Sequence, residues 1–110
     1  MIGVTADSFN EEVLQSDKAV LAVFSSDQSS KCDNALSILE NLSEEFSGIR
    51  FVKIDIIENQ EFASRLGIGI VPSFVLFKDG KAIGGFSGSD LGQIKAKTEE
   101  LAAKINFVTL

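Results

Sequence analysis

Residues 19–46 read AVLAVFSSDQSSKCDNALSILENLSEEF, and the rest of the chain is arranged around them. The stretch begins with a continuous apolar run over residues 20–24, which is typical of a strand buried on both faces of a sheet. A polar segment over residues 25–30 interrupts the run, and apolar residues then recur at helical spacing from Cys32 to Phe46. We therefore predict a buried strand, a short loop and an amphipathic helix whose first turn holds the only cysteine. A thiol in that position lies near the positive end of the helix dipole, where a thiolate is stabilised.

The other segments alternate between predicted strands and helices. Asn59 is a candidate helix cap, and Asp79-Gly80 is a strong hairpin signal. We expect the remaining strands over residues 2–5, 49–56, 73–78 and 81–87, and the remaining helices over residues 8–15, 59–66 and 91–105. This order, β-α-β-α-β-α-β-β-α, predicts one α/β domain over residues 1–110, with helices on both faces of a partly parallel sheet and an antiparallel edge. Residues 106–110 form an apolar tail, for which fraying is the default expectation.

Composition argues against several classes of function. A formal net charge of −6 disfavours nucleic acid and anionic membranes as main partners. The chain has no histidine, so it lacks Ser-His and Cys-His pairs and imidazole metal ligands, and we expect no metal site and no cofactor. No apolar run is long enough to span a bilayer, and no secretory leader is expected from the first residues. A single cysteine excludes a disulfide within the chain and favours a reducing, cytoplasmic location.

The element order, with a cysteine opening the long helix and a proline before the fourth strand, resembles the thioredoxin family. The resemblance extends from about residue 2 to residue 105. The residues that carry it are Phe9, 20–24, 52–55, Asn59, 66–68, 71–81 and 86–88. The resemblance implies a thioredoxin fold, with a mixed five-stranded sheet in the order 1-3-2-4-5 flanked by four helices. It also implies a cis bond between Val71 and Pro72, and a role in thiol-disulfide redox chemistry and cell redox homeostasis.

The active-site segment departs from the family pattern. Thioredoxins have Trp-Cys-Gly-Pro-Cys where this chain has Gln28-Ser29-Ser30-Lys31-Cys32. In that register, Ser29 takes the place of the attacking cysteine and Cys32 that of the resolving cysteine. Ser25 and Gln28 replace the two tryptophans of the family. Val23 replaces the buried aspartate that assists proton transfer to the resolving thiol.

These replacements remove the parts of a dithiol cycle. Reduction of a disulfide needs a thiolate that attacks and a second thiol that releases the mixed disulfide. The Ser29 hydroxyl stays protonated at neutral pH, and we interpret Ser29 as the helix cap rather than as a nucleophile. Cys32 has two interpretations: a buried structural residue, which we favour, or a single thiol that forms mixed disulfides.

Two further features follow from the resemblance. Lys53 corresponds to a lysine that pairs with the missing aspartate, so it is a candidate to stabilise the Cys32 thiolate. The alternative is that Lys53 extends to solvent or pairs with Asp55, and we favour that alternative. The second feature is a groove for an extended peptide. The residues assigned to this groove are Gln28, Ser30, Lys31, Val71, Pro72 and Gly88.

Three hypotheses about function remain open. The first is an atypical thioredoxin-like protein of the thiol-redox class that cannot run the dithiol cycle as written. The second is a non-catalytic thioredoxin-fold module that binds peptides or proteins. The third is an active thioredoxin in which Ser29 was engineered from cysteine or selenocysteine. The implied partners are an extended segment of a client protein and, for the redox hypotheses, a thioredoxin reductase.

Overall fold

A computed structural model describes residues 1–27, 29–88 and 90–109, and the side chains of these residues as far as residue 104. The helices and strands follow the predicted order. They are β1 (Ile2–Gly3), η1 (Asn10–Leu14), β2 (Ala19–Ser25), α1 (Ser30–Glu45), β3 (Ile49–Asp55), α2 (Gln60–Arg65), β4 (Ser73–Lys78), β5 (Lys81–Ser87) and α3 (Leu91–Thr109). Helix α3 continues four residues beyond its predicted end, so residues 106–109 are helical where we expected a tail.

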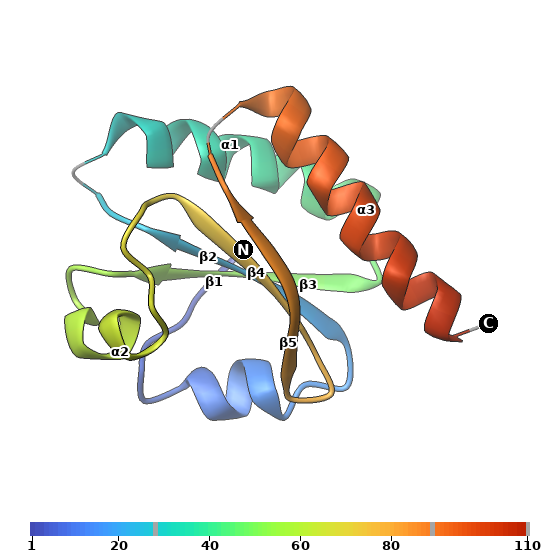
Figure 1. Cartoon of the computed structure of the whole chain (residues 1–110), viewed down its shortest axis with the longest axis horizontal. Helices are drawn as coiled ribbons and strands as arrows, with labels where there is room; N and C mark the ends of the chain where they lie inside the picture. The colour runs from blue at the N-terminus through green and yellow to red at the C-terminus, as the bar shows by residue number, and fades with distance from the viewer. Residues whose placement is uncertain (28, 89, 110) are drawn as a thin grey trace.

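The five strands form one mixed sheet in the order β1-β3-β2-β4-β5, which confirms the predicted thioredoxin topology. Strands β1, β3 and β2 are parallel, whereas β4 and β5 run antiparallel to their neighbours. Helices α1 and α3 cover one face of this sheet, and α2 and η1, the blue helix, lie on the other (Figure 1). The hairpin turn between β4 and β5 is confirmed, because Asp79 and Gly80 both have positive φ, as a two-residue turn requires.

Strand β2 lies in the middle of the sheet, and all seven of its residues are buried. Its side chains alternate between two hydrophobic clusters. Leu21 and Val23 pack under α1 and α3, whereas Val20, Ala22 and Phe24 pack with residues of η1 and the opposite face. This two-sided burial explains why the strand is a continuous apolar run rather than an alternating one.

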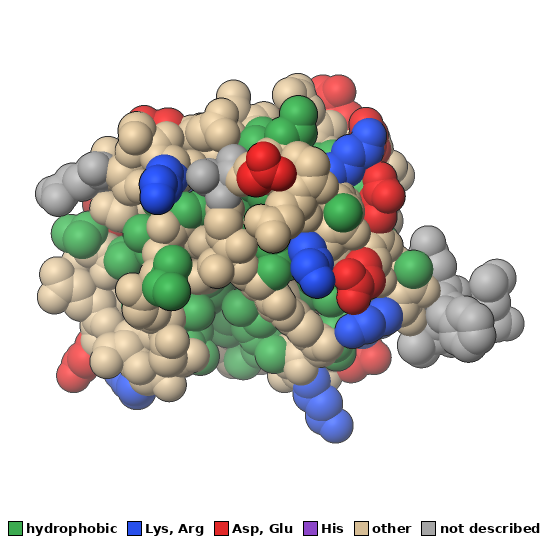
Figure 2. Space-filling model, turned by 45° about the horizontal axis from the view of Figure 1, so that its top comes forward, with side chains coloured by type: hydrophobic (Ala, Val, Ile, Leu, Met, Phe, Trp, Pro, Cys, Tyr) green, Lys and Arg blue, Asp and Glu red, His purple; other side chains and the backbone are tan. Residues whose placement is uncertain are grey.

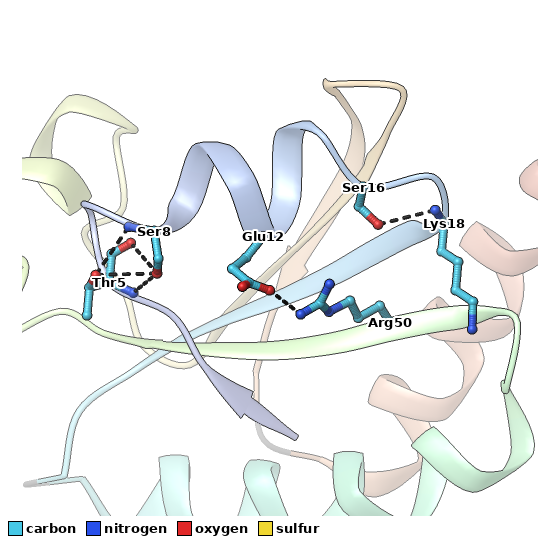
Figure 3. A network of polar contacts seen from close by, with 6 residues as sticks. All are labelled: Thr5, Ser8, Glu12, Ser16, Lys18 and Arg50. Carbon is cyan, nitrogen blue, oxygen red and sulfur yellow. Dashed lines mark hydrogen bonds and ion pairs between the residues drawn. The ribbon is translucent and has the colours of Figure 1, made fainter.

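The first helix is a single π-type turn rather than an α-helix. The backbone N–H of Gln15 donates to the carbonyl of Asn10 at 2.9 Å, an i to i+5 bond. Polar contacts lie before the segment, within it and after it, where the backbone N–H of Lys18 donates to the Ser16 hydroxyl at 3.2 Å (Figure 3). Thr5 and Ser8 exchange backbone-to-hydroxyl bonds at 3.0 and 3.3 Å before the turn, and Arg50 of β3 pairs with Glu12 within it.

Asn59 precedes α2 as predicted, but its side chain does not cap the helix. Instead, its Oδ1 accepts the backbone N–H of Ala6 at 2.9 Å, and its Nδ2 donates to the carbonyl of Asp55 at 2.8 Å. The side chain thereby ties three segments together: the residues after β1, the end of β3 and the start of α2. The Asn59 side chain therefore joins distant segments of the chain instead of capping the helix that follows it.

Removing this tie should weaken the fold measurably. We expect Asn59→Ala to lower the free energy of unfolding by about 1–2 kcal/mol, because two hydrogen bonds are lost. Urea denaturation followed by circular dichroism measures this change. Asn41→Ala, on the exposed side of α1, is the matched control and should change stability by less than about 0.5 kcal/mol. Equal effects of the two variants would show that Asn59 ties nothing together.

Candidate functional site

Cys32 lies in the first turn of α1, with no exposed surface. Its Sγ accepts a weak hydrogen bond from the backbone N–H of Ser26 at 3.4 Å. Ser26 belongs to the loop between β2 and α1, which covers the sulfur from outside. A large disulfide substrate therefore cannot reach this thiol unless the loop moves.

Ser29 is the N-cap residue of α1, and its side chain is half-buried. Its Oγ accepts the backbone N–H of Cys32 at 3.4 Å, which satisfies one of the free donors at the helix start. Within the described part of the chain, no carboxylate contacts this hydroxyl to act as a base. The side chain is therefore engaged as a helix cap, which is the role that we predicted for it.

Three of the predicted groove residues, Val71, Pro72 and Gly88, lie together. The bond between Val71 and Pro72 is cis, and the backbone N–H of Gly88 donates to the carbonyl of Pro72 at 3.2 Å. The register pairs Phe24 of β2 with Ser73 of β4, which places the Val71–Pro72 bond beside the end of β2. The cis bond and the β2–α1 loop therefore lie at the same end of the sheet, where β2 ends and β4 begins.

Two of the remaining residues that we assigned to the groove lie at the start of α1. Ser30 and Lys31 are exposed on the first turn of α1, and Gln28 lies outside the described residues. A residue that we did not predict, Ile70, adjoins Val71 with 67% of its surface exposed. The sequence did contain a signal for Ile70, because an isoleucine stands directly before the Val-Pro pair in a connection that is expected to contact water. Ile70 therefore presents an exposed apolar side chain next to the predicted groove residue Val71.

Lys53 does not reach Cys32. The register places Lys53 of β3 beside Val23 of β2, on the face that α1 covers, but its side chain is exposed. Among the described residues, its ammonium takes part in no ion pair. The position therefore favours the solvent-facing interpretation of Lys53 over a contact with the thiol.

The distribution of charged side chains bears on which ligands the described residues could bind. Figure 2 shows Lys and Arg side chains scattered among Asp and Glu side chains, with hydrophobic side chains between them. Within the described ranges, no three Cys, Asp or Glu side chains are grouped so that they could hold a metal ion. None of the helices in those ranges is long and apolar enough to cross a membrane.

Comparison with known proteins agrees with this geometry. The family model for thioredoxin matches residues 1–106. A thioredoxin of Rickettsia bellii is 40% identical over 79 residues, which are 71% of this chain and 75% of that protein. The human thioredoxin is 32% identical over 85 residues, covering 77% of this chain and 81% of the relative. Thioredoxin 1 of a Nostoc species is 32% identical over 81 residues, covering 73% and 76% of the two chains.

Proposed function

Since the chain belongs to the thioredoxin family, and so to the thiol-disulfide redox class, we propose that it binds extended segments of client proteins without completing a dithiol cycle. The proposal rests on one observation, namely that neither Ser29 nor Cys32 presents a reactive thiol at the surface. The Ser29 hydroxyl caps α1, and the Cys32 sulfur is buried beneath the loop. Neither position supplies an exposed thiolate, and turnover needs one such thiolate and a second thiol.

The groove supports the binding half of this proposal. Pro72 has no N–H, and its carbonyl accepts the backbone N–H of Gly88, so the two residues form a fixed contact at this end of the sheet. An extended peptide could pair with exposed backbone groups next to this contact. Val71 is half-buried and Ile70 is exposed beside it, so an apolar client residue would lose water on binding there.

The proposed partners and location follow from the same features. The client is a protein segment in extended conformation. A thioredoxin reductase is a partner only if a second thiol is present, as in the hypothesis that Ser29 was engineered. We place the protein in the cytoplasm, where a lone buried thiol stays reduced.

The reactivity of Cys32 tests the catalytic half of the proposal. In the native protein, Cys32 should react with 5,5′-dithiobis(2-nitrobenzoate) at least about a hundredfold more slowly than in urea, because labelling must wait for local opening. The rate of absorbance change at 412 nm measures this. Native labelling as fast as that of the unfolded chain would instead favour a single-thiol redox protein that forms mixed disulfides.

A further inference from the structure

Strand β5 is the outermost strand of the sheet, and no strand of the described chain pairs with its outer side (Figure 1). The backbone N–H of Gly88 donates to the carbonyl of Pro72, so these two residues form a hydrogen-bonded pair. Because such pairs alternate along an antiparallel ladder, Gly85 and Ser87 direct their own N–H and C=O groups away from β4. Both residues are exposed, so these four backbone groups are available to a further strand.

The edge has few of the features that usually keep another chain from pairing with a strand. Natural edge strands are commonly protected by charged side chains, by proline or by a bulge. Residues 82–87 read AIGGFS, with no charge and no proline. A bulge is present at Ile83, which the register leaves without a partner on β4. The stretch from Gly84 to Ser87, beyond the bulge, is therefore the part of the edge that can receive a strand.

Helix α3 lies directly against this stretch. A Cβ atom on Gly84 would lie 2.7 Å from Cδ2 of Leu101 and 3.9 Å from Nζ of Lys104, so the Lys104 ammonium lies over the strand. Among the described residues, Lys104 forms no ion pair, and neither does Lys81 at the start of β5. The edge therefore combines accessible backbone groups with two ammonium groups, in a chain whose formal net charge is −6.

The position of α3 decides between two kinds of partner. A second copy that paired its β5 with this β5 about a twofold axis would bring its own α3 to the same face of the sheet. Packed helices need about 8–10 Å between their axes, whereas paired strands lie only about 4.8 Å apart. Since α3 already lies against Gly84, two copies would collide, and a single extended segment would not.

We propose that the outer edge of β5 binds an extended segment of a partner protein that carries an acidic side chain opposite Gly84. The segment adds a strand to the sheet and pairs its backbone with Gly85 and Ser87. A side chain directly across from Gly84 has its Cβ about 5 Å away, so a glutamate there reaches the Lys104 ammonium. The edge lies outside the groove, so the inference goes beyond the proposed function, and either can fail without the other.

Titration of ¹⁵N-labelled protein with the acetylated and amidated peptide TVTETVT tests the site. We expect saturable changes in the amide signals of Gly84, Gly85 and Ser87. A peptide with lysine in place of the glutamate should bind at least about threefold more weakly. Lys104→Gln should remove this preference. The matched control, Lys95→Gln, changes an exposed position of the same helix and should leave the preference unchanged.

Two changes to the backbone test the added strand itself. Ser87→Pro removes an N–H group that points away from β4, so the ladder within the protein keeps its bonds. It should weaken binding of TVTETVT about fivefold, with circular dichroism confirming that the variant is folded. Ser87→Ala keeps the N–H and should bind as the unmodified protein does. A peptide that is N-methylated at its threonine amides leaves the protein unchanged, and it should also bind at least about fivefold more weakly.

Four results would overturn the proposal. Shifts with TVTETVT that are absent, or that are confined to Val71 and Gly88, would exclude binding at the edge. Equal affinity for the glutamate and lysine peptides would show that the acidic side chain is not recognised. Unchanged affinity of the N-methylated peptide would exclude an added strand. A dimer of the free protein in sedimentation, dissociated by Ser87→Pro, would assign the edge to a second copy instead.

Discussion

Ser29→Cys is expected to give this chain protein-disulfide reductase activity at least about a hundredfold above the unmodified protein. The new sulfur would replace the Ser29 Oγ, whose position is 3.4 Å from the backbone nitrogen of Cys32. The start of α1 lowers the pKa of a thiol placed there, because the helix dipole favours the thiolate. The introduced thiolate can attack a client disulfide and release one client thiolate. Cys32 can then lose its proton to water, attack the mixed disulfide and release the second client thiolate.

Reduction of insulin by dithiothreitol, followed as turbidity, measures this gain. The control is Ser30→Cys, which places a thiol one residue further on, at an exposed position that does not cap the helix. If only Ser29→Cys gains activity, the groove still presents a client disulfide to the N-cap position. If Ser29→Cys stays inactive, the replacement of the tryptophans and of the buried aspartate has removed more than one step. The interpretation as a binding module would then stand alone.

Much of the fold could be predicted from the sequence, because strands and turns leave local patterns of apolar and turn-forming residues. A continuous apolar run over residues 20–24 is typical of a strand covered on both faces, and β2 is that strand. The pair Asp79-Gly80 accepts positive φ at both positions and fixes the hairpin. The sheet order was implied by the resemblance to the thioredoxin family over about residues 2–105, because parallel pairing leaves no short-range signal.

Other features could not be predicted because they depend on distant partners. Asn59 stands at a cap position, but its side-chain amide bonds to the backbone N–H of Ala6 and the carbonyl of Asp55 instead of to the start of the helix. The π-type turn at Asn10–Leu14 differs from an α-helix by one residue in its hydrogen bonding, which composition does not reveal. The end of α3 was missed because an apolar sequence at a terminus is compatible with either a helix or a tail.

The candidate site shows the same division. Ser29 as a helix cap is a local expectation, and the structure has that cap. The burial of Cys32 and the exposure of Lys53 agree with the interpretations that we favoured for these two residues. Ser25 lies beside Asp55 because of the register between β2 and β3, which the sequence alone does not reveal.

Val23→Asp, which introduces the carboxyl that the resemblance implies for this position in the family, should lower the free energy of unfolding by about 3–5 kcal/mol at neutral pH. Val23 has no exposed surface and packs in the cluster that includes Leu21 and Leu39. Lys53 lies beside it in the register, but the Lys53 side chain is exposed and would have to turn inward to pair. The introduced carboxylate would therefore lose its water without gaining a partner.

The pH dependence of the stability of Val23→Asp distinguishes the cost of burying a charge from the cost of lost packing. Burial raises the pKa of the introduced carboxyl above that of the unfolded chain. Below the unfolded value, about 4, the group is neutral in both states, so the cost of charge burial is absent. The cost then grows as the pH rises towards the folded value. Urea denaturation at several pH values should therefore show a larger loss at pH 7 than at pH 4.

Val23→Asn has nearly the same shape but no titration, so its loss of stability should not follow this pH dependence. A Val23→Asp variant that is more stable at pH 7 than at pH 4, relative to Val23→Asn, would reverse the sign. It would mean that Lys53 turns inward and holds the carboxylate as an ion pair, which lowers the pKa of that carboxyl. Lys53→Met in the same background would then abolish the gain. That result would show that Val23 alone keeps Lys53 in solvent and separates it from the buried thiol.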